Sequence, residues 1–178
     1  FHKNGYVAGC EKTREGVVID PGDEVDALLE AVSAHRLNLR YILLTHAHLD
    51  HITGVKRAKD ALGVPVGLHQ ADNFLYEAVV QQGRAFGFPV EAQPPVDFFY
   101  EPEGTLAFGN YVVRIQHTPG HCPGGVCLTI ERADGAERSL FVGDTLFAGS
   151  IGRTDLPGGD TEVLLRSINE VLFAYPDE

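Results

Sequence analysis

The sequence predicts a mixed α/β fold in which each half of the chain supplies strands to a sheet and helices to its outer face. In residues 23–36, DEVDALLEAVSAHR, the apolar side chains recur at the spacing of an amphipathic helix. Residues 39–45, LRYILLT, form a continuous apolar run that is typical of a strand buried on both faces. In the second half, two β-rich segments flank Gly109-Asn110, a dipeptide that favours a hairpin turn.

The first half of the chain alternates strands and helices. A strand over 16–20 (GVVID) ends at the Pro21-Gly22 turn and precedes the helix over 23–36. The strand over 39–45 leads into the loop THAHLDH, and ligands bind at such carboxyl ends of strands in open α/β sheets. We expect four further segments: a helix over 52–62, a strand over 64–69, a helix over 71–86 and a proline-rich connection over 87–97.

The second half is richer in strands. Segments 105–108 and 111–117 form the hairpin around Gly109-Asn110. Two more strands are expected within 124–131 and 138–144, joined by the turn ADGAE. The last predicted element is a helix over 161–173, with Thr161 as its N-cap.

The composition indicates a globular protein that binds neither nucleic acid nor membranes. The 178 residues are 44% apolar and 22% charged, which fits a single domain over 1–178. The net charge of −11 opposes binding to phosphate-rich partners, and no apolar run is long enough to span a bilayer. Three cysteines make a poor disulfide framework, so we expect a reduced, cytoplasmic setting. Because the chain starts without Met and stops in a connection, we expect truncation at both ends.

The loop THAHLDH concentrates three histidines and one aspartate, namely His46, His48, Asp50 and His51. A hydrogen-bonded polar loop is one interpretation, but crowded imidazoles repel one another when protonated and lose solvation when buried. A metal ion removes both objections, since zinc and non-haem iron accept imidazole and carboxylate ligands. In an extended turn, His46 and His48 would face one metal ion, while Asp50 and His51 would face a neighbouring one.

Two later loops at strand ends contain further candidate ligands. His121 lies in HTPGHCPGG, after the strand over 111–117, and Asp144 lies in FVGDTLF. Taken alone, an aspartate at a strand end is more often a helix cap or a turn residue, but beside the histidine motif we expect Asp144 to bind metal. Glycines in both loops allow the close backbone approach that such a site needs.

The stretches THAHLDH, TPGHCPGG and GDTLFAGSIGRTDLPGGD, in this order, resemble the metallo-β-lactamase superfamily, and more narrowly its bacterial single-domain branch akin to glyoxalase II. The resemblance implies a four-layered αβ/βα sandwich with two metal ions, for which we expect zinc, with iron or manganese as alternatives. It implies three ligands for the first metal ion (His46, His48 and His121), two for the second (Asp50 and His51), and Asp144 as a bridge between them. Asp20 in IDPG would support the histidine loop, although a turn residue is an equal interpretation.

Three further residues of the chain bear on this ligand set. His117 precedes TPG, whereas the family ligand follows it, so we expect His121 and not His117 to bind metal. The family uses the position of Cys122 without a thiolate. Family members complete the second site with a histidine beyond the last helix, and the chain ends at Glu178 before any such residue, which we attribute to truncation.

The resemblance implies hydrolysis of a small thioester such as S-lactoylglutathione by a metal-activated hydroxide. Asp144 would hold this hydroxide and Asp50 would orient it, and a thiolate leaving group needs little acid catalysis. Arg153 falls where glyoxalase II contacts glutathione, although pairing with Asp155 is the other interpretation. A persulfide dioxygenase with one iron is the alternative, because DHITG and GRTD also occur in that family. A non-catalytic, metal-stabilised module is the third hypothesis.

Overall fold

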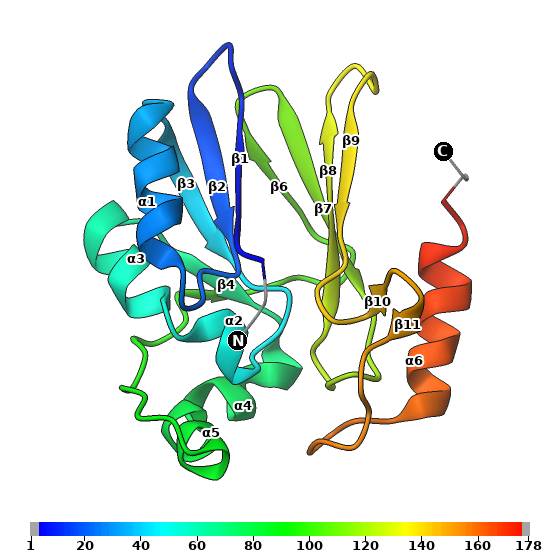
Figure 1. Ribbon diagram of the computed structural model, residues 1–178. Helices are drawn as coiled ribbons and strands as arrows, with labels where there is room; N and C mark the ends of the chain where they lie inside the picture. Colours follow the sequence, from blue (N-terminus) through cyan, green and yellow to red (C-terminus); the bar gives the residue numbers. More distant parts are fainter. Residues whose placement is uncertain (1–3, 176–178) are drawn as a thin grey trace.

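The computed structural model describes residues 4–175, and two β-sheets face each other between outer layers of helices (Figure 1). In the first sheet the strand order is β1-β2-β3-β4-β5, with β1 antiparallel to β2 and the other neighbours parallel. These strands are β1 (Tyr6–Gly9), β2 (Glu15–Ile19), β3 (Asn38–Leu43), β4 (Val66–Leu68) and β5 (Phe98–Phe99).

The second sheet is antiparallel throughout, with the order β6-β7-β8-β9. Its strands are β6 (Thr105–Phe108), β7 (Tyr111–His117), β8 (Val126–Arg132) and β9 (Arg138–Phe141), and a separate two-stranded ribbon consists of β10 (Leu146–Phe147) and β11 (Ser150–Ile151). The predicted hairpin is confirmed, since Phe108 pairs with Tyr111 across a turn in which Gly109 has a φ of 53°.

The helices flank the two sheets or lie at one edge of the sandwich (Figure 1). They are α1 (Val25–Ala34), α2 (Leu49–Ile52), α3 (Val55–Leu62), α4 (Asn73–Glu77), α5 (Val79–Phe86) and α6 (Thr161–Ser167), which continues as a π-helical segment (Ile168–Leu172). Helices α1 and α3 cover the first sheet, and α6 covers the second, whereas α2, α4 and α5 lie at one edge of the sandwich. Within residues 4–175, no helix has both the length and the apolar character needed to cross a membrane.

Successive side chains of β3 point into two different apolar clusters. Ile42 belongs to the cluster between the first sheet and its helices, whereas Leu43 belongs to the cluster between the two sheets. Successive residues of a strand point to opposite faces, so a strand buried on both faces reads as a continuous apolar run. A third cluster joins Cys127 of β8 to Leu164 of α6. The predicted αβ/βα sandwich is therefore confirmed.

Several element boundaries differ from the prediction. The helix expected over 52–62 is two helices, α2 and α3, because the chain turns at Gly54, where a Cβ atom would overlap the carbonyl oxygen of Pro21. The helix expected over 71–86 begins as a short 3-10 turn at Gln70–Asp72 and is interrupted at Ala78, between α4 and α5. Strands β1, β5, β10 and β11 were not predicted.

The N-cap of α6 is Asp160 rather than Thr161. The Asp160 carboxylate accepts a hydrogen bond from the backbone N–H of Val163 at 3.0 Å, which satisfies one of the unpaired donors in the first helical turn. The Thr161 hydroxyl instead contacts the hydroxyl of Thr154 at 2.6 Å. Asp160 and Thr161 are both residue types that cap helices, so the sequence pattern alone does not distinguish them; in the structure Asp160 is the cap.

Candidate metal centre

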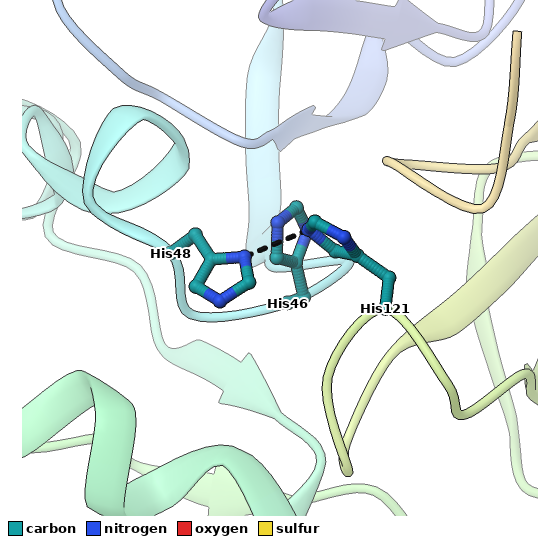
Figure 2. Close-up of side chains that lie close together, drawn as sticks. All are labelled: His46, His48 and His121. Carbon is teal, nitrogen blue, oxygen red and sulfur yellow. Dashed lines mark hydrogen bonds between the residues drawn. The ribbon is translucent and has the colours of Figure 1, made fainter. Parts of the chain in front are cut away.

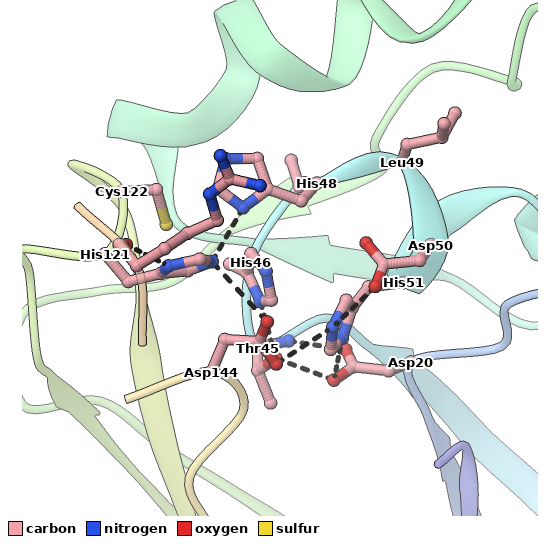
Figure 3. A network of polar contacts seen from close by, with 12 residues as sticks. Asp20, Thr45, His46, His48, Leu49, Asp50, His51, His121, Cys122 and Asp144 are labelled. Carbon is pink, nitrogen blue, oxygen red and sulfur yellow. Dashed lines mark hydrogen bonds and ion pairs between the residues drawn. The ribbon is translucent and has the colours of Figure 1, made fainter. Parts of the chain in front are cut away.

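The six predicted ligands come from three loops at one edge of the sandwich (Figure 3). His46 follows β3, and the other residues of the histidine motif lie at or within α2: His48, Asp50 and His51. His121 lies in the loop between β7 and β8, and Asp144 lies between β9 and β10. The backbone N–H of Val126 in β8 donates to the carbonyl oxygen of Thr45 at 2.8 Å, so the first two loops are held together directly.

Three buried histidines form the first part of the centre, as Figure 2 shows. One nitrogen of each of His46, His48 and His121 lies within 4.8 Å of the others. Nδ1 of His48 and Nε2 of His121 face each other at 2.7 Å, although 73 residues separate them in sequence. This arrangement has the donor atoms, number and spacing that suit a divalent transition-metal ion.

The second part of the centre adjoins the first and shares His46 with it. One ligand atom of each of His46, His51 and Asp144 lies within 4.8 Å of the others. The two oxygens of Asp144 face different histidines: Oδ1 lies 3.2 Å from Nε2 of His51, and Oδ2 lies 3.7 Å from Nε2 of His121. Asp50 is outside both groups, with its Oδ2 3.8 Å from Nε2 of His51.

Oxygen acceptors fix the orientation of three imidazoles. Nδ1 of His51 lies 2.9 Å from Oδ2 of Asp20, and Nδ1 of His121 lies 2.7 Å from the carbonyl oxygen of Arg153. Nδ1 of His46 lies 3.1 Å from the hydroxyl of Thr45. If each Nδ1 carries the proton, each Nε2 keeps its lone pair for a cation, which is the usual arrangement around metal-bound histidines.

Burial and neighbouring charges favour, in His48 and Asp144, the protonation states that metal binding requires. Burial, together with the charges of His121 and His51, lowers the pKa of His48 to about 3, so His48 is neutral at pH 7. Burial alone would raise the pKa of Asp144, but its hydrogen bond with His51 and its electrostatic interactions with the neighbouring histidines lower it overall. A neutral imidazole and an ionised carboxylate are the forms that coordinate a cation, so His48 and Asp144 fit a divalent metal ion.

Asp20 supports the histidine loop, as one of its two interpretations predicted. This carboxylate is buried, and its backbone φ of 48° places it just after β2 instead of within the strand. Its Oδ1 accepts from the backbone N–H of Thr45 at 2.7 Å, and its Oδ2 accepts from the Thr45 hydroxyl at 2.6 Å and faces His51. One carboxylate therefore orients His51 directly and His46 through Thr45.

The variant Asp20→Asn should lower metal affinity by about 10- to 100-fold, the usual cost of removing a carboxylate that supports a ligand histidine. An amide keeps one acceptor oxygen, but its NH2 group cannot accept from Thr45 or His51. Competition with a chromophoric chelator measures the affinity. Asp26→Asn is the matched control, because Asp26 pairs with Arg57 on the surface. Equal affinities for both variants would exclude the supporting role.

Two residues that hold the ligand loops were not predicted. Asp72 is fully buried; its Oδ2 accepts from Ala47 N at 3.0 Å and from Cys122 Sγ at 3.1 Å, and its Oδ1 accepts from Gly124 N at 2.5 Å. Gln82 of α5 accepts from the backbone N–H of Leu49 at 3.0 Å and donates to the carbonyl oxygens of Ala47 and Leu75. Asp72 lies in ADNFLYE, where the pattern indicates only a helix.

Arg153 has an exposed side chain that pairs with Asp155 through two contacts of 2.7 Å. This is the pairing that the sequence left as an alternative to substrate contact. The backbone of the same segment also lies close against Asp144, since a Cβ atom at Gly152 would overlap the carbonyl oxygen of Asp144. The segment after β11 therefore packs directly onto the ligand loops.

A cleft of about 160 Å³ opens onto the centre, and we call it the α5 cleft. Its lining includes four of the predicted ligands and three apolar side chains: His48, Asp50, His121, Asp144, Leu49, Phe86 and Leu156. Arg153 also lines it. A larger cleft of about 480 Å³ reaches His51 and Asp144 from the side of Asp20. The centre is therefore accessible to a small molecule.

Comparisons with known proteins agree with this geometry. A model of the metallo-beta-lactamase superfamily matches residues 3–175. Hydroxyacylglutathione hydrolase GloC of Haemophilus influenzae is 37% identical over 167 residues, which cover 93% of this chain and 77% of that protein. The crystal structure of the BLEG-1 B3 metallo-beta-lactamase has a TM-score of 0.85 at 37% identity, covering 98% of this chain and 82% of that one. TTHA1623 in a di-iron-bound form has a TM-score of 0.81 at 40% identity, covering 97% and 82%. With its histidine and aspartate cluster at the expected edge of the sandwich, the chain belongs to the metallo-β-lactamase superfamily.

Proposed function

We propose that this protein is a metal-dependent hydrolase that cleaves small thioesters of the S-acylglutathione type, such as S-lactoylglutathione. The observation that carries the proposal is the convergence of three buried histidines and Asp144 beside an open cleft. The relative GloC, named as a hydroxyacylglutathione hydrolase, supports this choice of substrate. Other small thioesters remain within the same chemical class.

In this proposal, His46, His48 and His121 hold one metal ion, Asp50 and His51 contribute to a second, and Asp144 contacts both. Zinc is the expected metal, and iron is an alternative because the similar protein TTHA1623 has a di-iron form. When bound, the metal lowers the pKa of water to roughly 7 and polarises the substrate carbonyl. The two oxygens of Asp144 suit the shared role, since they face His51 and His121 separately.

The protein side chains would manage protons and substrate position. Asp50 is about a quarter exposed and lies beside His51, so it can accept the proton that water loses on adding to the thioester carbonyl. The thiolate can leave without a proton donor because it is a weak base, with a thiol pKa of about 8.5, and it takes up a proton from water after release. Arg153, at the rim of the α5 cleft, would bind a carboxylate of the glutathione part after exchanging its contact with Asp155.

The test is hydrolysis of S-lactoylglutathione by protein reconstituted with zinc, measured as release of free thiol. We expect turnover that a chelator abolishes and that added zinc restores. Oxygen consumption on glutathione persulfide with one equivalent of iron would instead favour the persulfide dioxygenase. A folded, metal-loaded protein that does neither would favour the non-catalytic module.

A further inference from the structure

We propose that the α5 cleft binds the acyl part of the substrate and selects short, apolar acyl groups. This inference rests on the proposed thioesterase function and adds its specificity. Three side chains of the cleft are apolar: Leu49, Phe86 and Leu156. They lie beside His48 and His121, where the reacting carbonyl would have to sit.

The uncharged polar side chain in the lining, Gln82, is already committed to the protein. The amide of Gln82 accepts from Leu49 N at 3.0 Å and donates to Ala47 O at 3.0 Å and to Leu75 O at 2.8 Å. Both of its N–H donors are thereby used for holding the histidine loop. Gln82 therefore offers no donor to a substrate, and the α5 side of the cleft recognises apolar surface.

Two residues of the lining suit different parts of a thioester. Arg153 offers a cation for the charged thiol part, whereas Phe86 offers an exposed aromatic ring for the acyl part. Phe86 is the last residue of α5 and is 45% exposed, so a ligand can cover its ring without displacing protein. Each methylene group buried there should raise kcat/KM by roughly fourfold.

The size of the cleft limits this gain to short chains. Its volume of about 160 Å³ is small beside the roughly 300–1,000 Å³ of typical ligand pockets. An acyl chain longer than a few carbons would therefore extend into solvent. We therefore expect kcat/KM to rise from acetyl to butyryl and then to level off.

The experiment measures kcat/KM of the zinc-loaded protein for S-acetyl-, S-propionyl-, S-butyryl- and S-hexanoylglutathione, which share one thiol. In Phe86→Ala we expect the rise from acetyl to butyryl to shrink to about twofold or less. Phe88→Ala is the matched control, since Phe88 is 48% exposed, follows two residues later and does not line the cleft. This variant should retain the wild-type profile.

The outcomes separate the inference from the proposed function. A wild-type protein that hydrolyses all four thioesters at equal kcat/KM would overturn the acyl selection alone. The same holds if Phe86→Ala and Phe88→Ala change the profile equally. A wild-type protein that hydrolyses none of them, while metal-loaded and folded, would overturn the thioesterase function and this inference with it.

Discussion

Replacing His121 with alanine should remove metal from the centre and abolish turnover. His121 faces His48 at 2.7 Å and lies near Asp144, so its loss breaks the group of three histidines and removes a neighbour of Asp144. A bound metal contributes several kcal/mol to catalysis, and a loss of ~4 kcal/mol lowers the rate about a thousandfold. Metal content by mass spectrometry and kcat/KM on S-lactoylglutathione measure the two effects.

His117→Ala is the matched control, because the two histidines flank the same Thr-Pro-Gly segment. His117 is exposed; its Nε2 contacts the carbonyl oxygen of Pro123 at 2.8 Å, and its ring stacks on His69 with centroids 4.1 Å apart. We expect metal content to be unchanged and activity to change by no more than about twofold, as for other surface substitutions. Full metal content in His121→Ala, or equal losses in both variants, would contradict the ligand assignment.

The sequence predicted those parts of the fold in which burial determines residue type. The strand over 39–45 was recognisable because Ile42 and Leu43 face different apolar layers and both must be apolar. Strand β1, with the sequence YVAG, was not recognisable, since it is a short edge strand that exists by pairing with β2. The two-residue strands β5, β10 and β11 likewise depend on partners rather than on their own composition.

The candidate site was predictable to the extent that its ligands form a local pattern. His46 and His48 are two residues apart, so their proximity follows from the backbone. Asp72 could not be recognised this way, because its partners Ala47 and Gly124 are 25 and 52 residues away and are backbone groups. Every residue except proline has a backbone N–H, so the residue types at positions 47 and 124 give no indication that Asp72 binds there.

Asp72→Ala should destabilise the protein and weaken metal binding together. Three buried donors, Ala47 N, Gly124 N and Cys122 Sγ, would lose their acceptor. Each unsatisfied donor costs about 1–3 kcal/mol, and the sulfur contributes least, so we expect a loss of about 3–6 kcal/mol in the free energy of unfolding. Ala47 lies between two ligands and Cys122 adjoins His121, so freeing them should also lower metal affinity, by about 10- to 100-fold.

Urea unfolding of the metal-free variant measures the free energy of unfolding. Chelator competition in the absence of urea measures the metal affinity. Asp160→Ala separates the two, because it removes only the side-chain N-cap of α6, at a cost of about 1 kcal/mol, and keeps the backbone hydrogen bond from Asp160 N to Gly120 O beside His121. Asp72→Asn keeps one acceptor oxygen and should fall between the wild type and Asp72→Ala in both measurements. If Asp72→Ala lost stability but kept wild-type metal affinity, Asp72 would hold the fold alone, and the three histidines would be placed by other contacts.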